Sequence, residues 1–474
     1  MNPFILSIDA GTTGITVLVL DHQANICKKY YSEFTQHYPQ PGWVEHDGEE
    51  IWEVTHKLIQ SAFKDYTPQD CAGIGITNQR ETTLIWNQYN DQPIYHAIVW
   101  QCRRTRAICQ ELKDAGYETA FKKKTGLVID CYFSGTKIKW LLDNCDGALE
   151  KAQGGSLLFG TIDCWLLWKL TRGKVHATDY TNASRTLIFN IDNLNWDNDL
   201  LSILNIPDSL LPEVLVSSGK FGETDPELFG VPIPITGIAG DQQAALFGQG
   251  CYKPGESKCT YGTGCFLLTN TGSQRINSSA GLLTTIACDH QGKPVYALEG
   301  SVFIGGAVIQ WLRDELQLLK HASDSDKMAQ SVQNNHGIVI VPAFTGLGAP
   351  YWDMEARGII TGLTRGSNRN HIVRAALESI AYQVKDLLDA IFIDMDLDLP
   401  SLKVDGGAVA NHFLMQFQAN ILKQKIDRPV NIESTALGAG MLAGLASGFW
   451  VNTQELVETR KTDHIFSPKM QEDQ

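Results

Sequence analysis

The run Gly240-Asp241-Gln242-Gln243 lies between two apolar stretches, residues 233–239 and residues 244–247. The first stretch is typical of a buried strand, and the second indicates the start of a helix. An isolated Gly-Asp at such a junction is most often a helix N-cap. Burying a carboxylate without a partner is costly, however, and proteins tolerate it mainly where the charge is used. The run therefore predicts a strand followed by a helix, with Asp241 either as a cap or as a functional acid.

The composition of the chain narrows the classes of protein to consider. The 474 residues are 43% hydrophobic and 19% charged, which is typical of a globular protein with more than one domain. The formal net charge of −14 makes a nucleic-acid partner a poor expectation, because such binders usually carry a basic face. No apolar run approaches the roughly 20 residues of a membrane span, and no signal peptide is expected. The 11 cysteines, scattered without a CxxC pair, indicate reduced thiols and a cytoplasmic location.

A turn rich in glycine and threonine joins the first two predicted strands, residues 4–8 and residues 15–20. Asp9 ends the first strand, and Gly11-Thr12-Thr13-Gly14 follows it. Glycine lets backbone N–H groups approach a phosphate, threonine hydroxyls add donors, and a carboxylate oxygen suits Mg²⁺. An ordinary hairpin with an Asx turn explains the segment equally well. Because neither GxxxxGK[ST] nor GxGxxG after a strand occurs, we expect neither a P-loop nor a dinucleotide fold.

Two further glycine turns lie in the second half of the chain. Gly262-Thr263-Gly264 joins predicted strands at residues 258–261 and 265–269, and Gly406-Gly407 precedes a helix predicted at residues 411–422. Each turn alone is weak evidence, since glycine is common in turns. Three such turns beside strand ends indicate a nucleotide held between two domains of similar architecture. A stretch with three Gly residues and one Pro, 248–256, predicts a division of the chain into domains at residues 1–247 and 248–474.

The adjacent charges Arg80-Glu81 are the best candidates for binding a small polar ligand. A guanidinium donates hydrogen bonds and a carboxylate accepts them, so the pair suits a diol. Trp100, Tyr132 and Phe266 offer aromatic faces for its carbon atoms. On an exposed loop the ion pair would mean little, and each aromatic residue alone is more often part of a core.

Apolar residues at three- and four-residue spacings predict helices that alternate with the strands, so we expect an α/β fold. These helices are predicted at residues 100–115, 135–143, 161–170, 302–318, 370–391 and 411–422.

Several stretches of the chain resemble the FGGY carbohydrate kinases, which belong to the actin-like ATPase superfamily. The resemblance extends from residue 5 to about residue 466 and is nearest to the members that phosphorylate glycerol. It implies two ribonuclease-H-like α/β domains with mixed central sheets, an active site in the cleft between them, and a homo-oligomer, either a dimer or a tetramer. The stretches that carry it are residues 41–47, 75–83, 100–105, 132–144, 179–185, 344–352 and 358–378.

The resemblance also implies roles for the candidate residues. The N-terminal domain would bind glycerol and phosphate, and the C-terminal domain would bind the adenine nucleotide, so that ATP and glycerol give ADP and sn-glycerol 3-phosphate. Asp241 would act as general base, and Asp9 with Asp241 would position Mg²⁺. Glycerol would contact Arg80, Glu81, Trp100, Tyr132, Asp241, Gln242 and Phe266. ATP would contact Thr12, Thr13, Gly14, Thr263, Gly306, Gln310, Gly407 and Asn411.

The chain departs from the family pattern in three places. Gly14 and Thr16 stand where these kinases usually carry a serine and an arginine that contacts nucleotide phosphate. Losing such a charge-assisted donor costs about 1.5–3 kcal/mol, so weaker nucleotide binding or slower turnover is expected. Residues 225–232 lack the loop that binds fructose 1,6-bisphosphate and the phosphorylated loop histidine, so neither form of regulation is expected. We expect no counterpart of the family's usual C-terminal helix between residue 466 and residue 474.

Two other functions stay open from the sequence. A kinase for another small polyol or sugar would keep Asp241 but alter the surroundings of Arg80-Glu81 and Phe266. A non-catalytic, actin-like nucleotide-binding protein would have no need of a base at Asp241.

Overall fold

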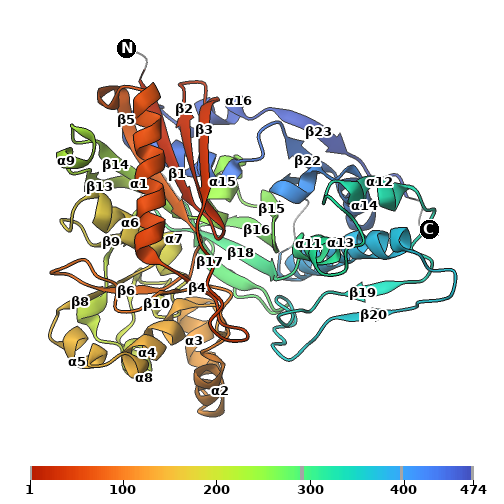
Figure 1. Ribbon diagram of the computed structural model, residues 1–474, viewed down its shortest axis with the longest axis horizontal. Coiled ribbons are helices and arrows are strands. Elements are labelled where there is room, and N and C mark those ends of the chain that lie inside the picture. Colours follow the sequence, from red (N-terminus) through yellow and green to blue (C-terminus); the bar gives the residue numbers. More distant parts are fainter. Residues whose placement is uncertain (1–2, 289–292, 396–398, 471–474) are drawn as a thin grey trace. The chain divides into compact units, whose positions relative to one another are not determined.

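The computed structural model describes residues 3–288, 293–395 and 399–470 (Figure 1). The chain forms two compact units. Unit 1 comprises residues 1–250, 285–295 and 435–459, and unit 2 comprises residues 251–284, 296–434 and 460–474. Each unit contains a mixed β-sheet with helices against it, so the α/β class is confirmed.

A six-stranded sheet forms the centre of unit 1, in the order β13-β14-β5-β1-β2-β3. β1, β5 and β14 run parallel to one another, whereas β2, β3 and β13 run antiparallel to their neighbours. The parallel strands are almost wholly apolar because helices cover both faces of the sheet. The six strands are β1 (Phe4–Ala10), β2 (Gly14–Leu20), β3 (Ile26–Glu33), β5 (Cys71–Asn78), β13 (Ser218–Glu223) and β14 (Pro234–Gly240).

One face of this sheet packs its large apolar side chains against α1 (Gly48–Asp65) and α6 (Ile162–Leu170). Asp47 caps α1 by accepting a hydrogen bond from the Glu49 N–H, and Ile51 and Ile59 of α1 face the sheet. Alternate residues of the strands, such as Ile74 and Ile76, join the same cluster. Figure 1 shows α1 running along these strands.

The opposite face of the same sheet is built from small residues. Gly75 lies between Ile74 and Ile76, and a Cβ on it would lie 2.2 Å from the carbonyl oxygen of Ala439. Ser7 donates a hydrogen bond to the carbonyl oxygen of Ala436. These contacts allow the backbone of α15 (Ser434–Ala446) to lie directly on the sheet. A segment from the end of the sequence is therefore part of unit 1.

The remaining elements of unit 1 are short strand pairs and helices around the sheet. The strand pairs are β4 (Glu45–His46) with β7 (Ala97–Ile98), β6 (Leu84–Asn87) with β8 (Leu157–Gly160), β9 (Ala177–Asp179) with β12 (Glu213–Leu215), and β10 (Phe189–Asn190) with β11 (Asn195–Trp196). The helices are α2 (Arg106–Asp114), α3 (Glu118–Thr125), α4 (Ser134–Asn144), α5 (Ala148–Gln153), α7 (Tyr180–Ala183), α8 (Asn198–Leu204), α9 (Pro226–Phe229), α10 (Asp241–Gly248), α16 (Thr453–Thr459), η1 (Pro68–Asp70) and η2 (Asp208–Leu210).

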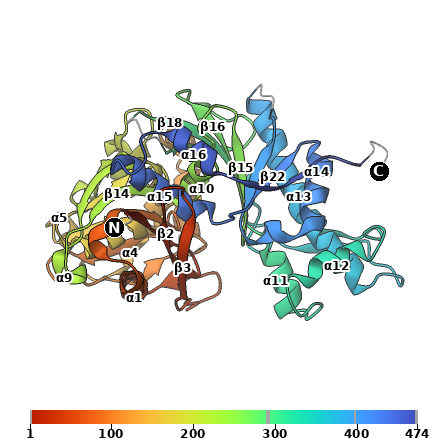
Figure 2. The ribbon, with the colours of Figure 1, turned by 90° about the horizontal axis from the view of Figure 1, so that it is seen from above.

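The second sheet has seven strands in the order β17-β18-β16-β15-β21-β22-β23. The strands are β15 (Ser257–Tyr261), β16 (Cys265–Gly272), β17 (Leu283–Ala287), β18 (Val295–Val302), β21 (Leu402–Asp405), β22 (Ile426–Pro429) and β23 (Thr462–Phe466), and a separate ribbon pairs β19 (Val339–Val341) with β20 (Ile359–Thr361). The helices are α11 (Ala307–Asp314), α12 (Asp324–Gln330), α13 (Arg369–Asp394), α14 (His412–Leu422) and η3 (Gly407–Ala410). Figure 2 shows α13 beside α14, which packs on β22.

The two predicted hairpins are confirmed, whereas two predicted helices begin later than expected. β1 pairs antiparallel with β2, and β15 pairs antiparallel with β16. The helix predicted from residue 100 begins at Arg106, because the preceding backbone bonds elsewhere: the Trp100 N–H donates to the Thr82 hydroxyl and the Arg103 N–H to the Gly42 carbonyl. The helix predicted from residue 302 begins at Ala307, because β18 continues to Val302.

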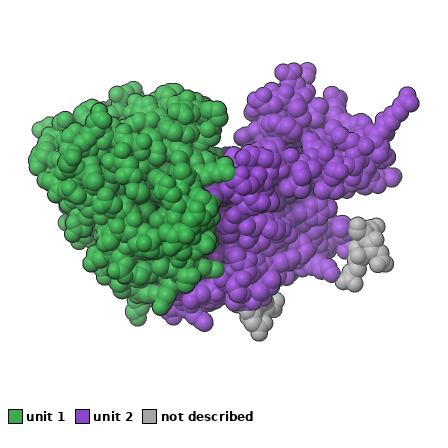
Figure 3. Space-filling view, turned by 90° about the horizontal axis from the view of Figure 1, so that it is seen from below, with its two compact units in different colours: residues 1–250, 285–295, 435–459 green, residues 251–284, 296–434, 460–474 purple. Residues whose placement is uncertain are grey.

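The division of the chain differs from a single cut at residue 247. The first break, between residues 250 and 251, lies inside the predicted boundary segment 248–256, but residues 285–288, 293–295 and 435–459 group with unit 1 (Figure 3). A helix that returns to a sheet from the far end of the chain leaves no local sequence signal. Among the described helices, none is both long and apolar enough to cross a membrane.

Gly75→Ala should destabilise unit 1, because the new methyl group would overlap the Ala439 carbonyl of α15. Overpacking of this kind costs about 1–3 kcal/mol, so we expect a lower urea midpoint. Gly154→Ala is the matched control, because Gly154 is exposed and the nearest atom to its added Cβ is 3.3 Å away. Equal midpoints for the two variants would contradict the close packing of α15.

Candidate active site

The carboxyl ends of three parallel strands bring the candidate residues of unit 1 to one edge of the sheet. β5 lies between β1 and β14, with Asp9 paired to Thr77 and Thr77 paired to Ala239. Neighbouring strands lie about 4.8 Å apart, so the main chains at Asp9 and Ala239 are about 10 Å apart, and Asp241 follows two residues after Ala239. Carboxyl ends of parallel strands are the usual place for ligands in α/β folds.

Asp241 is the first residue of α10, and Gly240 takes the N-cap position. The cap interpretation of Asp241 is therefore wrong. A side chain at residue 240 would collide with Arg80, whose Cδ lies 2.7 Å from the position of a Cβ. The side chain of Asp241 is 27% exposed, and its Oδ1 accepts a hydrogen bond of 2.8 Å from the Gln242 N–H. Asp241 thus keeps a carboxylate at the surface of the strand end.

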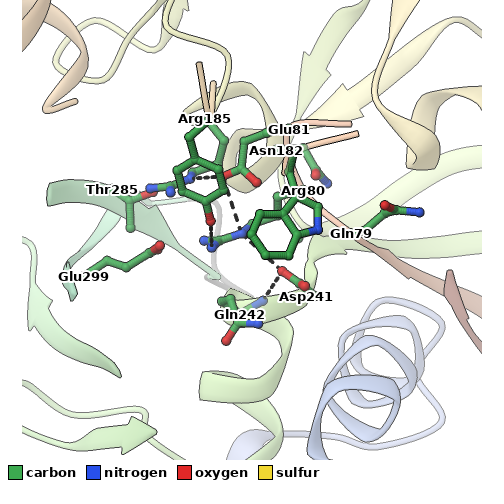
Figure 4. A network of polar contacts seen from close by, with 12 residues as sticks. Gln79, Arg80, Glu81, Asn182, Arg185, Asp241, Gln242, Thr285 and Glu299 are labelled. Carbon is green, nitrogen blue, oxygen red and sulfur yellow. Dashed lines mark hydrogen bonds and ion pairs between the residues drawn. The ribbon is translucent and has the colours of Figure 1, made fainter. Parts of the chain in front are cut away.

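Arg80 is the buried cation at the centre of this edge (Figure 4). Its Nε lies 3.1 Å from Oδ1 of Asp241 and 3.8 Å from Oε1 of Glu81. Its Nη1 donates to Oε1 of Gln243 at 3.1 Å, and its Nη2 donates to the Tyr132 hydroxyl at 3.2 Å. The sequence suggested that Arg80 pairs with its neighbour Glu81, but Asp241 is the nearer acid. The arrangement fixes the guanidinium next to the candidate base.

Glu81 has a different cationic partner. Its Oε1 lies 2.6 Å from Nε of Arg185, and Figure 4 shows the two side chains facing each other. The backbone of Glu81 is left-handed, with φ of 60°, which is uncommon for a residue with a side chain. Its carbonyl oxygen accepts hydrogen bonds from the hydroxyls of Thr83 and Ser134. Backbone strain that neighbours hold in place is typical of functional sites.

The segment Asp179-Tyr180-Thr181-Asn182 holds two strand ends in place. The buried carboxylate of Asp179 accepts hydrogen bonds from Thr181, Asn182 and Ser217. The Thr181 hydroxyl accepts one from the Gly240 N–H at 2.8 Å, and Asn182 accepts one from Asn78 at 3.1 Å. Burial raises the pKa of Asp179, while its hydrogen bonds act in the opposite direction. This segment therefore positions the backbone that carries Asp241.

The glycine-threonine turn of unit 1 contacts Trp100, one of the residues predicted to bind the polyol. Nε1 of Trp100 donates a hydrogen bond of 2.9 Å to the Thr12 hydroxyl. The rings of Trp100 and Tyr132 meet edge-on, with their centroids 5.7 Å apart. Thr13 is exposed. A Cβ at Gly14 would lie 2.8 Å from the hydroxyl oxygen of Tyr31, so Tyr31 occupies the space that a serine here would need.

Unit 2 contains a cavity of about 460 Å³ that is lined by all five nucleotide candidates of that unit. The hairpin turn and the start of α11 are joined, because the Gly306 N–H donates to the Gly262 carbonyl at 2.8 Å. Asn411 caps α14 and donates to the Ser325 hydroxyl at 3.1 Å. Apolar side chains, among them Ile309 and Ile380, complete a wall suited to a flat ring. The five candidates are Thr263, Gly306, Gln310, Gly407 and Asn411, and Gly262 also lines the cavity.

Phe266 and Gln242 are the remaining two residues predicted to contact the polyol. Phe266 belongs to unit 2, where it is buried on β16 opposite Thr260 and Ser301. Gln242 is buried in the first turn of α10, next to Asp241. The predicted contact of each with a polyol stays a prediction.

Among the described residues, no group of three or more His, Cys, Asp or Glu side chains lies close enough to hold a metal ion. Mg²⁺ in phosphoryl-transfer sites is usually bound by one or two carboxylates together with phosphate oxygens and waters. The oxygen donors of Asp9 and Asp241, at one sheet edge, fit that kind of site.

Three residues of the site had no role in the sequence interpretation: Gln243, Arg185 and Lys137. Gln243 joins Arg80 to Thr285 and to the Ile286 carbonyl. Arg185 and Lys137 are fully buried cations. No signal in the sequence pointed to Arg185, because Arg80 next to Glu81 already offered that carboxylate a cation within the same segment.

The sequence matches two models of one family. The model described as the FGGY family of carbohydrate kinases, N-terminal domain, matches residues 4–248, and the C-terminal domain model matches residues 257–447. The chain belongs to the FGGY family of carbohydrate kinases, and its two units have the two-domain fold of that family.

The relatives with high identity are named glycerol kinase. The protein from Carboxydothermus hydrogenoformans is 60% identical and the match covers 99% of this chain and 94% of that protein. The protein from Desulfitobacterium hafniense is 58% identical, over 100% of this chain and 96% of that protein. The crystal structure of Plasmodium falciparum glycerol kinase with ADP is similar with a TM-score of 0.91 at 39% identity, and covers 100% of this chain and 95% of that one. A ligand-bound xylulose kinase from Lactobacillus acidophilus has a TM-score of 0.88 at 24% identity, which shows the fold alone.

Lys137→Met should change how stability depends on pH. Lys137 is buried on α4 and donates to the carbonyls of Tyr132 and Glu81, and burial lowers its pKa from 10.5 to about 8. Between these values the unfolded chain binds a proton that the folded chain has released, so the free energy of unfolding of the native protein rises with pH. Between about pH 8 and pH 10.5, the free energy of unfolding of the native protein should rise by up to about 3 kcal/mol relative to that of the variant.

Urea unfolding of both proteins across that pH range measures the effect. A difference in unfolding free energy that stays constant with pH would contradict the lowered pKa of Lys137.

Proposed function

We propose that this chain transfers the γ-phosphoryl group of ATP to a primary hydroxyl of glycerol and releases ADP and sn-glycerol 3-phosphate. The observation that carries the proposal is the Asp241 carboxylate, held 3.1 Å from the buried guanidinium of Arg80 at the end of a parallel strand. The identity of 60% to a relative named glycerol kinase supports the choice of substrate.

Arg80 and Glu81 supply the polar contacts for a small polyol. Arg185 and Asp241 hold the two side chains by ion pairs, which leaves their orientation little freedom. A guanidinium donor beside a carboxylate acceptor matches vicinal hydroxyls, and the rings of Trp100 and Tyr132 cover the carbon atoms. A site built from fixed donors and acceptors discriminates strongly against ligands that leave them unpaired.

Asp241 acts as the general base. The attacking hydroxyl must lose its proton as its oxygen bonds to the γ-phosphorus, and an ionised carboxylate within hydrogen-bond reach accepts that proton. The proton moves to an oxygen of Asp241, and the bond from the γ-phosphorus to the ADP oxygen breaks. Thr181, through the Gly240 N–H, positions the main chain that carries this base.

In unit 1, Thr12, Thr13 and Gly14 are the donors for phosphate. In unit 2, the lining of the cavity suits adenosine. Mg²⁺, when bound with ATP, neutralises developing phosphate charge, and Asp9 with Asp241 would hold it. We further propose that the protein is cytoplasmic and forms a homo-oligomer, either a dimer or a tetramer.

A coupled ADP-release assay tests the reaction and its substrate. With Mg-ATP, we expect the highest kcat/KM for glycerol in a panel that also contains dihydroxyacetone, glyceraldehyde, erythritol and xylulose. Asp241→Asn should lower kcat by about 10²- to 10⁴-fold, because a carboxamide cannot accept the proton. Asp146→Asn, at an exposed position, is the control.

A higher kcat/KM for another panel member would show that this compound, and not glycerol, is the preferred substrate. Absence of ADP release with every member would favour a nucleotide-binding protein without kinase activity. Normal turnover by Asp241→Asn would remove Asp241 from its proposed role.

We call the glycine-threonine turn of unit 1, residues 11–14, the phosphate turn. Thr16 lies where an added cation would face this turn. Thr16 pairs with Asp9 on one side and with Tyr31 on the other. Directly paired residues of antiparallel strands project to the same face, so the three side chains share one face of the sheet.

Thr16→Arg should lower the KM for ATP by about tenfold or more, because it adds a charge-assisted donor worth about 1.5–3 kcal/mol. Thr16→Gln, of similar reach but without charge, is the control. Steady-state kinetics with ATP as the varied substrate measure the change. If Arg and Gln have the same effect, or if the KM for ATP does not fall, the missing cation does not limit nucleotide binding.

A further inference from the structure

Behind the phosphate turn of unit 1, a chain of hydrogen bonds runs through a buried histidine. Nε2 of His46 lies 2.7 Å from Oε1 of Gln36, and Nδ1 of His46 lies 3.1 Å from Nε2 of Gln79. Gln79 can only donate at this contact, so Nδ1 of His46 is the acceptor and Nε2 carries the proton. Burial lowers the pKa of His46 to about 3, so the ring is neutral at ordinary pH and keeps this tautomer.

The two amides on either side of His46 end on the phosphate turn. Nε2 of Gln36 donates to the Thr12 carbonyl at 3.0 Å, and Nε2 of Gln79 donates to the Gly11 carbonyl at 3.1 Å. Gln36 binds His46 through its oxygen and the Thr12 carbonyl through its nitrogen. Gln79 uses the two hydrogens of its nitrogen, one for His46 and one for the Gly11 carbonyl.

The same chain closes on itself through the predicted polyol residue Trp100. Oε1 of Gln79 accepts from the Thr82 hydroxyl at 3.0 Å, and that hydroxyl accepts from the Trp100 N–H at 3.3 Å. Nε1 of Trp100 then donates to the Thr12 hydroxyl at 2.9 Å. Gln36, His46, Gln79, Thr82, Trp100 and Thr12 thus form a closed ring of hydrogen bonds with consistent donors and acceptors.

The ring determines which way the N–H groups of the turn point. In a planar trans peptide the C=O and the following N–H point in opposite directions. Holding the Gly11 and Thr12 carbonyls against unit 1 therefore turns the N–H groups of Thr12 and Thr13 away from it. In the part of the chain that the structure describes, these two N–H groups donate to no protein acceptor. They remain available to phosphate oxygens.

We propose that Gln36, His46 and Gln79 are positioning residues for phosphoryl transfer, which orient the Thr12 and Thr13 N–H groups toward the phosphates of ATP. The inference rests on the proposed function, since it assigns ATP to this turn. None of the three side chains needs to touch ATP, because each acts through the backbone of the turn. Loss of one hydrogen bond should affect ATP more than glycerol.

Gln36→Met is the sharpest test, because it keeps the length of the side chain and removes its hydrogen bonds at a part-exposed position. We expect the KM for ATP to rise about three- to tenfold, as loss of one such hydrogen bond predicts, and the KM for glycerol to change less than about twofold. Calorimetric titration with a non-hydrolysable ATP analogue should show the same loss of affinity. Gln23→Met is the matched control, because Gln23 is exposed on a different turn.

A second pair of variants tests the histidine. His46→Leu removes both hydrogen bonds at a fully buried position, whereas the Oδ1 of His46→Asn keeps an acceptor for Gln79. We expect His46→Asn to recover part of the analogue affinity that His46→Leu loses, with thermal midpoints recorded for both.

Equal analogue affinity for Gln36→Met and the native chain would overturn the inference, as would an equal rise in both KM values. These outcomes are distinct from failure of the proposed function. If the native chain phosphorylates no substrate of the panel, the proposed function fails, while the analogue titrations still decide whether the ring supports nucleotide binding.

Discussion

The ion pair between the buried guanidinium of Arg80 and the partly exposed carboxylate of Asp241 is the interaction on which the candidate site depends. A guanidinium that is 2% exposed needs acceptors around it, and Asp241, Gln243 and Tyr132 supply them. This requirement explains local features that are otherwise unfavourable. Gly240 lacks a side chain because Arg80 passes over it. The same strand end then presents a carboxylate that is held in place yet still reaches solvent.

Close approach of backbone to backbone is the second constraint on unit 1. Glycines in β5 and β14 let α15 lie against the sheet. A Cβ added to Gly237, for example, would lie 2.6 Å from the backbone nitrogen of Ala443. The opposite face of the same strands carries isoleucine, so one strand serves a tight helix contact and an apolar core at once. The register that results puts Asp9, Gln79 and Asp241 at one edge.

The two units carry different kinds of candidate residues. Unit 1 carries charged and hydrogen-bonding groups fixed by one another, which suits a small polar substrate and its proton transfer. Unit 2 carries a cavity of about 460 Å³ with glycine turns and apolar walls, which suits a nucleotide. Both units use a strand, a glycine-threonine turn and a second strand, so the same kind of hairpin occurs twice.

The sequence by itself determined the α/β class, the two glycine-threonine hairpins and the strand-to-helix junction at Asp241, because these depend on short-range patterns of apolar residues and turn chemistry. It also pointed to Arg80 and Glu81, since adjacent opposite charges in an apolar setting are conspicuous. Only the tertiary structure decided their partners. Arg185 and Gln243 lie more than a hundred residues away from them along the chain, and α15 returns to the first sheet from the far end. The physical reason is that a buried charge or a sheet face specifies the kind of neighbour it needs but not where in the chain that neighbour lies.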